Sequence, residues 1–362
     1  MLSNVLKKLD WGLIGLISIL GCISLISLYS IDKTFFYRQI IWYLLGMGVI
    51  FLGPLINWQW LLAQKWFRQG FYWFSCFLLV VPLVQQSSIR GINSWIVIGG
   101  FQFSPAEISK IALIIILAGF FSRRYIAAWR IKNIAISLFY TMIPAGLIAV
   151  QPNLGTAAIV FFIWIGFLFI SGINKKRLAI GLILLIVLSS LGWFYFLEDY
   201  QKSRIKGFLN PAKNPLGVNY NVTQAKIAIG SAGWLGKGFG SGPQTQLGFL
   251  PEPHTDFIFA SFIEEWGLIG GAVLVLTYLS LIVKISFVSL EVRRNTRKFV
   301  GLGIAIVFLV HFLVNIGSNV GILPVIGVSL PFVSYGGSNL LMSSILISIV
   351  ERIRTSKFQP LK

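Results

Sequence analysis

Residues 11–30 read Trp11-Gly-Leu-Ile-Gly-Leu-Ile-Ser-Ile-Leu-Gly-Cys-Ile-Ser-Leu-Ile-Ser-Leu-Tyr-Ser30, a stretch without one charged side chain. A helix needs about 20 mainly apolar residues to cross the roughly 30 Å of hydrocarbon in a bilayer. The stretch is too long for the apolar part of a signal peptide and has no small-residue cleavage site. It is therefore expected to be a membrane-spanning helix that stays in the protein.

Similar stretches follow along the whole chain. Hydrophobic residues make up 56% of the sequence and charged residues 11%, against about 45–50% and about 25% in soluble domains. The alternation typical of barrel strands is missing, and lipid cannot satisfy an open strand edge, so the spans must be helices. The sequence predicts an all-α integral membrane protein, a single polytopic domain over residues 1–362 with about ten transmembrane helices. The expected spans are 11–30, 39–57, 69–86, 105–122, 134–150, 154–171, 178–196, 257–284, 299–320 and 332–352.

The positions of lysine and arginine predict the orientation. With a cytoplasmic N-terminus, 20 of the 30 fall in cytoplasmic segments and nine outside, and Lys110 lies within a span. Six of the nine belong to one long loop, where the positive-inside rule has little weight. Both termini are thus expected in the cytoplasm, with residues 198–254 forming an extracytoplasmic loop between helices 7 and 8. The net charge of +19 then reflects topology and anionic lipid, and no nucleic acid partner is expected.

The long loop contains a predicted short helix, Val222–Ile229, and then the glycine-rich segment Gly230–Gly242. Two interpretations of the glycines remain open. Their backbone N–H groups could converge on an anion beside Lys237, or the segment could be a flexible surface loop with turns.

Acidic residues near the spans are candidates for function, because an ionisable group at membrane depth costs at least about 2.5–3.5 kcal/mol. Glu107 follows Ser104-Pro-Ala, so it could cap the fourth helix and pair with Lys110 one turn later; a substrate role could be added to these. Of Glu264 and Glu265, two turns into the eighth span, at least one should face a polar interior.

Asp256 stands at the outer mouth of the eighth span. The structural explanation for it is a carboxylate placed at a helix N-terminus, where the macrodipole favours negative charge. The residues around Asp256 compete with that explanation, because they belong to a larger pattern.

Four motifs make up this pattern, in order along nearly the whole chain: Asn93-Ser-Trp-Ile-Val-Ile-Gly-Gly-Phe-Gln-Phe-Ser-Pro-Ala-Glu-Ile-Ser-Lys110; Gln151-Pro-Asn-Leu-Gly-Thr156; the loop from Asn210-Pro through Gly236-Lys-Gly and Gln244-Thr-Gln-Leu to Leu250-Pro-Glu-Pro-His-Thr-Asp256; and Leu330-Pro-Phe-Val-Ser-Tyr-Gly-Gly-Ser338. With about ten helices, they resemble the RodA/FtsW (SEDS) family of peptidoglycan glycosyltransferases. The resemblance implies an enzyme that polymerises lipid II into glycan strands at the outer face of the bacterial cytoplasmic (inner) membrane.

The resemblance also implies site residues. Asp256 is the expected catalytic base. The expected substrate-binding residues are Trp95, Arg38, Glu107, Lys110, Gln151, Asn153, Thr156, Lys237, Gln244, Gln246, Glu252, His254, Thr255 and Ser334. Three positions depart from the family pattern. Asn153 replaces the usual aspartate, which puts a carboxylate role there in doubt, and Ser104 and Ala106 replace a glutamine and a serine.

The implied chemistry converts an α-linked donor into a β-linked product, which requires inversion. One base must then take a proton from the attacking hydroxyl, while cations help the departing diphosphate. A free aspartic acid has a pKa of about 3.9, so Asp256 would need partial burial to become an effective base. No residue cluster marks a fixed metal site. A divalent cation, Mg²⁺ or Mn²⁺, remains a candidate, with Asp256 as one ligand.

The expected partners are lipid II, undecaprenyl-diphosphate-linked glycan, a class B penicillin-binding transpeptidase and other membrane proteins of the elongation complex. The Gly267–Gly271 pattern is one candidate seam for a partner helix. Short tails favour a RodA-like role in cell elongation and shape over the division-specific FtsW-like role. A lipid II flippase that performs no chemistry, and a nonenzymatic scaffold, are the alternatives from other classes.

Overall fold

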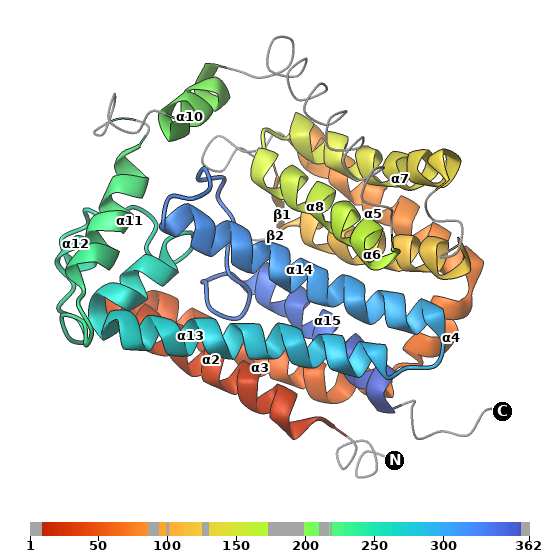
Figure 1. The fold of residues 1–362 in the computed structure, drawn as a ribbon, viewed down its shortest axis with the longest axis horizontal. Helices are drawn as coiled ribbons and strands as arrows, with labels where there is room; N and C mark the ends of the chain where they lie inside the picture. Colours follow the sequence, from red (N-terminus) through yellow and green to blue (C-terminus); the bar gives the residue numbers. More distant parts are fainter. Residues whose placement is uncertain are drawn as a thin grey trace.

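The computed structural model describes residues 9–85, 94–98, 101–124, 130–172, 199–209, 217 and 219–355. Most of them lie in helices that run along the long axis of the molecule (Figure 1). The long helices are α2 (Trp11–Ile31), α3 (Lys33–Leu52), α5 (Lys65–Gln85), α6 (Pro105–Arg124), α7 (Ile131–Val150), α8 (Leu154–Ile170), α13 (Ile258–Leu290), α14 (Asn295–Asn319) and α15 (Gly337–Thr355). The shorter elements are η1 (Gly53–Leu55), α4 (Trp58–Ala63), α10 (Asp199–Leu209), α11 (Tyr220–Ser231), α12 (Pro243–Gln246) and an antiparallel hairpin of β1 (Ile96–Ile98) and β2 (Phe101–Phe103).

The prediction of an all-helical, multi-pass membrane protein is confirmed. Seven helices of the described part are long and apolar enough to cross a bilayer, and α8 is a shorter apolar helix. The predicted span 178–196 lies outside the described residues, and 332–352 corresponds to α15, which begins only at Gly337. The predicted short helix in the long loop is present as α11.

Helix α3 begins at Lys33, earlier than the predicted residue 39. The reason is the side chain of Asp32, which accepts the Thr34 backbone N–H at 2.6 Å and caps the helix. This hydrogen bond holds the pKa of the exposed Asp32 carboxyl below its usual value. The turn between α2 and α3 is therefore tight.

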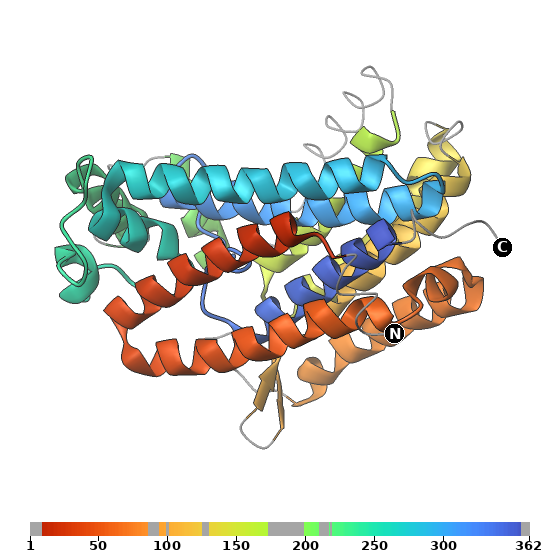
Figure 2. The same ribbon diagram turned by 90° about the horizontal axis from the view of Figure 1, so that it is seen from below.

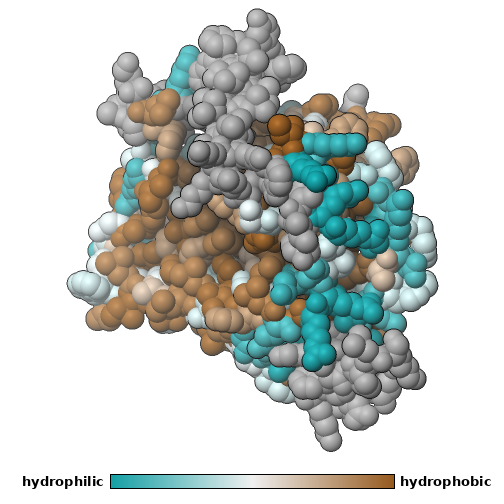
Figure 3. Space-filling model, turned by 45° about the vertical axis from the view of Figure 1, so that its right-hand side comes forward, coloured by the Kyte–Doolittle hydropathy of each residue, from teal (hydrophilic) through white to brown (hydrophobic). Residues whose placement is uncertain are grey.

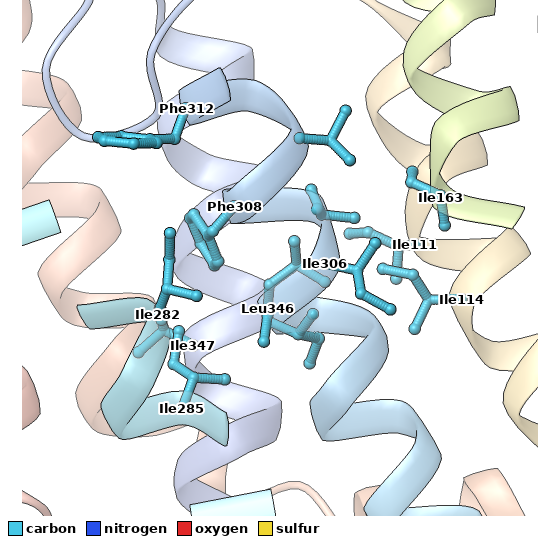
Figure 4. Packing of buried hydrophobic residues seen from close by; sticks show 14 of the residues in the cluster. Ile111, Ile114, Ile163, Ile282, Ile285, Ile306, Phe308, Phe312, Leu346 and Ile347 are labelled. Carbon is cyan, nitrogen blue, oxygen red and sulfur yellow. The ribbon is translucent and has the colours of Figure 1, made fainter. Parts of the chain in front are cut away.

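Apolar side chains fill the centre of the bundle. Figure 4 shows Ile306, Phe308 and Phe312 of α14 between the residues of α6 and α8 on one side and those of α13 and α15 on the other. At the periphery, large apolar side chains such as Leu44 and Phe77 are exposed, and Figure 3 shows a broad hydrophobic area beside hydrophilic ones. Such a surface fits contact with lipid.

Helix α13 is broken at Gly267, whose φ of 71° and ψ of −174° are not helical. The glycine-rich loop fits into this break. The N–H groups of Lys237 and Gly238 donate to the carbonyls of Glu264 and Glu265 (2.9 and 3.1 Å), and Leu268 N–H donates to the carbonyl of Gly233 (3.0 Å).

A methyl group at Gly267 would overlap the carbonyl of Trp234, so only glycine permits this approach. Because α13 uses the N–H groups of Lys237 and Gly238, neither interpretation of the glycine spacing, an anion cradle or a flexible loop, describes these two positions. The candidate partner seam is wrong at Gly267, since the chain's own loop covers that residue.

The start of α2 and the ends of α13 and α15 meet at one end of the molecule. Asp10 Oδ1 contacts Lys284 Nζ at 2.7 Å, and its Oδ2 contacts Arg354 Nε at 3.5 Å. Burial alone would raise the pKa of Asp10, but the hydrogen bonds from Lys284 and from the Leu13 backbone lower it overall. Figure 2 shows α11 and α12 at the opposite end. The start of α2 and the end of α15 thus lie at one end of the molecule, and the loop helices α11 and α12 lie at the other, as the predicted topology requires.

A reporter fusion tests the orientation itself. A reporter active only in the cytoplasm should be active when fused near Arg293, just after α13, and silent when fused near Pro243, the first residue of α12. The reverse pattern would place Asp256 on the cytoplasmic side and contradict synthesis outside the membrane.

Candidate functional site

Asp256 lies in a tight turn that leads into α13. The backbone N–H groups of Thr255 and Phe257 both donate to the carbonyl of Glu252 (3.1 and 3.3 Å), and Glu252 has a positive φ of 49°. The N-cap residue of α13 is Phe257, and it makes no side-chain capping hydrogen bond. Asp256 therefore stands one residue before the N-cap of α13.

Three successive carbonyls of this turn are fixed by other parts of the chain. Tyr335 N–H donates to the carbonyl of His254 at 2.8 Å, and Ser334 Oγ donates to that of Thr255 at 2.6 Å. The carbonyl of Asp256 accepts two hydrogen bonds from side-chain amides of α14, from Asn315 Nδ2 at 3.0 Å and from Asn319 Nδ2 at 2.9 Å. The backbone that carries the Asp256 carboxylate is thereby held from two sides.

The loop that supplies Ser334 and Tyr335 is in turn bound to α3. The fully buried Gln39 donates from Nε2 to the carbonyl of Ser334 (3.3 Å) and accepts the N–H of Gly336 at Oε1 (3.4 Å). One turn further along α3, the hydroxyl of Tyr43 donates to the carbonyl of Phe332. The motif Leu330–Ser338 is therefore a fixed part of the site.

The half-buried side chain of Asp256 lies close to Gly327, where an added methyl group would stand 3.6 Å from Oδ2. Gly327 has a φ of +70°, which favours glycine. The Gln151–Thr156 motif also contacts this segment, because a methyl group at Gly155 of α8 would overlap the carbonyl of Ile326, the residue before Gly327.

Aromatic and charged groups surround the outer mouth of the turn. The ring of His254 stacks on Phe35 with centroids 4.1 Å apart and planes 13° apart, and its Nε2 lies 3.5 Å from Glu252 Oε2. Arg38 is exposed on α3. After the Thr34 hydrogen bonds, the nearby His254 and Arg38 also lower the pKa of Asp32.

A second polar group lies in a small cavity between α6, α14 and α15. Lys110 is only 3% exposed, and its Nζ is 2.8 Å from Glu107 Oε1 and 2.9 Å from His311 Nε2. The predicted Glu107–Lys110 pair is confirmed, and Pro105 is the first residue of α6 as expected. Asn339 and Ser343 of α15 also line the cavity.

The comparisons with known proteins agree with this arrangement. The sequence model of the FtsW/RodA/SpoVE family, described as cell cycle proteins, matches residues 3–359. The chain belongs to the FtsW/RodA/SpoVE family. Among its relatives is the peptidoglycan glycosyltransferase MrdB of Escherichia coli (strain K12), which is 38% identical over 283 residues, 78% of this chain and 76% of the relative. The probable peptidoglycan glycosyltransferase FtsW of Haemophilus influenzae is 35% identical over 353 residues, 94% and 86% of the two chains.

Two solved structures share the fold of this family member. A chain of a peptidoglycan synthase complex, described as coordinating polymerization and crosslinking, has a TM-score of 0.84 and 30% identity, covering 97% of this chain and 99% of its own. The rod shape determining protein RodA of Thermus thermophilus has a TM-score of 0.73 and 27% identity, covering 97% and 98%.

Some of the substrate-binding residues expected from the family resemblance lie together at the Asp256 turn. They are Glu252, His254, Thr255 and Ser334, with Arg38 nearby and Glu107 and Lys110 in the cavity behind the Leu330–Ser338 motif. Gln151 is fully buried and donates from Nε2 to the carbonyl of Leu79 (2.6 Å), which fixes the end of α7 against α5. Trp95 is half-buried just before β1.

Other expected residues lie apart from this turn, around the break in α13. The backbone N–H groups of Gln244 and Thr245 donate to the carboxylate of Glu264 (2.7 and 3.1 Å). The amide of Gln246 bonds Ser30 and the carboxylate of Glu265. The prediction that one of the two glutamates faces a polar interior is confirmed, and the structure gives both of them polar partners. Gln244 and Gln246 attach the loop to α13 and α2.

Several residues of the site were missed by sequence reasoning. Gln39, Asn315, Asn319 and His311 are all buried within spans. Carboxamides carry no charge, so a search for ionisable residues at membrane depth passes over them. A search for buried amides spaced four residues apart, as Asn315 and Asn319 are, would have found the face of α14 that holds Asp256.

Asn153 caps α8, because its Oδ1 accepts the Thr156 N–H at 3.2 Å, while Nδ2 donates to Ser94 Oγ at 3.2 Å. Asn153→Asp, which restores the family residue, should keep nearly full activity, since aspartate also caps and the Ser94 hydroxyl can donate instead. Asn153→Ala should lose about 0.5–2 kcal/mol of stability. Thermal unfolding of both variants in detergent checks this; a strong loss of activity in Asn153→Asp would show that the amide itself is needed.

Proposed function

We propose that this chain is a peptidoglycan glycosyltransferase that polymerises lipid II at the outer face of the bacterial cytoplasmic membrane, with Asp256 as the catalytic base. The observation that carries the proposal is the fixation of three successive carbonyls at His254, Thr255 and Asp256. Preorganisation of this kind is expected at a group that must meet a reacting atom, because small displacements cost large factors in rate. Family membership and relatives named peptidoglycan glycosyltransferases support the same activity.

In the proposed reaction the 4-hydroxyl oxygen of one lipid II forms a bond to the anomeric carbon of the growing strand. The bond from that carbon to the undecaprenyl diphosphate oxygen breaks, and the diphosphate leaves with the electron pair. The hydroxyl proton passes to the carboxylate of Asp256. Attack opposite to the leaving group inverts the anomeric centre, which turns an α-linked donor into a β-linked product.

Cationic side chains would stabilise the departing diphosphate. Arg38 is exposed at the mouth, and Lys110 lines the cavity behind the Leu330–Ser338 motif. Within the described ranges no group of three or more His, Cys, Asp and Glu side chains could hold a metal ion. No step above depends on a metal ion. A divalent cation carried by the diphosphate stays a prediction, which chelation with EDTA would test.

We propose a class B penicillin-binding transpeptidase as the partner and cell elongation as the role. The similarity to a chain from a complex described as coordinating polymerization and crosslinking supports the partner, and the similarity to a rod shape determining protein supports the role. Relatives named FtsW are nearly as similar as those named MrdB. Complementation of strains that lack either the elongation or the division enzyme distinguishes the two roles.

The deciding experiment incubates the purified chain and its cognate transpeptidase with labelled lipid II and separates the products on a gel. Glycan polymer is expected, and it should disappear when the partner is omitted. Polymer from the isolated chain at the same rate would show that the partner is dispensable. No polymer, together with transport of lipid II across vesicles, would favour a flippase instead.

A further inference from the structure

The ammonium group of Lys110 is held by side chains from two helices. Glu107 stands one turn earlier on α6, and His311 approaches from α14 with Nε2 at 2.9 Å. His311 is only 2% exposed. The mechanism above uses Lys110 as a cation but gives no part to His311.

The two partners of His311 determine its protonation state. A lysine ammonium has three N–H donors and no acceptor, so Nε2 of His311 must accept the hydrogen bond from Lys110. The carbonyl of Ser329 can only accept, so Nδ1, which lies 2.9 Å from it, must carry the proton and donate. The ring is therefore neutral, with its acceptor toward Lys110.

His311 also contacts the segment that holds Asp256. Ser329 lies two residues after Gly327, and its Oγ accepts from Asn339 Nδ2 at 3.0 Å. One turn after His311 on the same face of α14, Asn315 donates to the carbonyls of Val328 (2.7 Å) and Asp256 (3.0 Å). One face of α14 thus holds both the Lys110 ammonium and the turn of Asp256.

We propose that His311 is a positioning residue for Lys110, which keeps the ammonium at a fixed distance from the Asp256 turn. This inference rests on the proposed polymerisation of lipid II. Two of the three N–H groups of Lys110 bind Glu107 and His311, so the direction of the third is set as well. Without an acceptor on α14, the flexible lysine side chain would be held from one side only.

The test compares two amides of different reach at position 311. In His311→Asn the side-chain amide takes the place of Nδ1, so it can still donate to the Ser329 carbonyl but falls short of Lys110. In His311→Gln the amide oxygen reaches the place of Nε2 and can accept from Lys110. Each variant thus keeps one of the two hydrogen bonds, and the rates show which bond matters.

The purified chain with its cognate transpeptidase is assayed on labelled lipid II. We expect His311→Gln to stay within about threefold of the wild-type rate and His311→Asn to lose about tenfold or more, because a charged donor loses its buried acceptor. Thermal unfolding of each variant shows whether it is folded. Ser318→Ala is the control, since Ser318 is buried on the same helix and its hydroxyl donates to the carbonyl of Asn315 within that helix.

The possible outcomes separate this inference from the proposed function. Equal rates in the two amide variants, whether high or low, or a faster His311→Asn protein would overturn the positioning role while polymerisation itself stands. If His311→Asn does not fold, His311→Gln still decides, because a folded His311→Gln protein with less than a tenth of the wild-type rate overturns the role. A wild-type complex that makes no polymer contradicts the proposed function, and the inference falls with it.

Discussion

Replacement of Asp256 by asparagine is expected to lower the rate of glycan synthesis by about 10²–10⁴ while lipid II still binds. A base acts mainly in the transition state, so its loss should appear in turnover rather than in affinity. Asparagine is nearly isosteric, and the hydrogen bonds of the turn come from the backbone carbonyls of His254, Thr255 and Asp256. The Asp256→Asn protein should therefore fold and keep the geometry of the site.

The rate is measured with the complex on labelled lipid II, and binding is measured separately with the same substrate. Asp32→Asn is a matched control, because Asp32 also lies at the outer end, caps α3, and can be replaced by asparagine as a cap. It should polymerise at close to the wild-type rate. Normal polymerisation by Asp256→Asn would end the assignment of the base.

Lys110→Met is expected to lower polymerisation by about 10²–10³, if the ammonium stabilises charge on the substrate as an oxyanion donor does. It should also destabilise the protein by about 3–5 kcal/mol, because Glu107 then keeps a carboxylate in a largely buried site without its partner. The two effects have different origins, so they can be separated. Rate and thermal unfolding are measured on the same preparation.

The double variant Lys110→Met with Glu107→Gln makes this separation. Removal of the unpaired carboxylate should restore most of the stability, because no buried charge is left alone. The rate should stay low, since the cation is still missing. Recovery of the rate together with stability would show that the pair serves only the fold.

Local patterns in the sequence were sufficient for most of the spans in the described part of the chain and for the Glu107–Lys110 pair. Length and composition determine whether a helix can cross lipid, and a separation of three residues places two side chains on one helix face. Contacts between distant segments had no such signal. The hydrogen bonds from Gln39 to Ser334 and from Asn319 to Asp256 depend on how helices pack, which no spacing within one helix records.

The glycine-rich loop shows the same limit. Its spacing indicated backbone groups with special conformations, and Gly236 and Gly267 do have φ values of 83° and 71°. The partner of this loop is the break in α13 at Gly267, which is distant in the sequence. Neither the glycine pattern around Gly236 nor the apolar pattern around Gly267 indicates that these two segments bind each other.

The break at Gly267 also bears on how deep the Asp256 turn lies in the bilayer. An unbroken α13 of 33 residues would be about 50 Å long at 1.5 Å per residue, well beyond the roughly 30 Å of hydrocarbon. Residues 268–290 alone give about 35 Å, which matches the hydrocarbon with slight tilt. The length of α13 therefore does not set the depth of Asp256. That depth follows from the helix that holds the turn, α14, through Asn315 and Asn319.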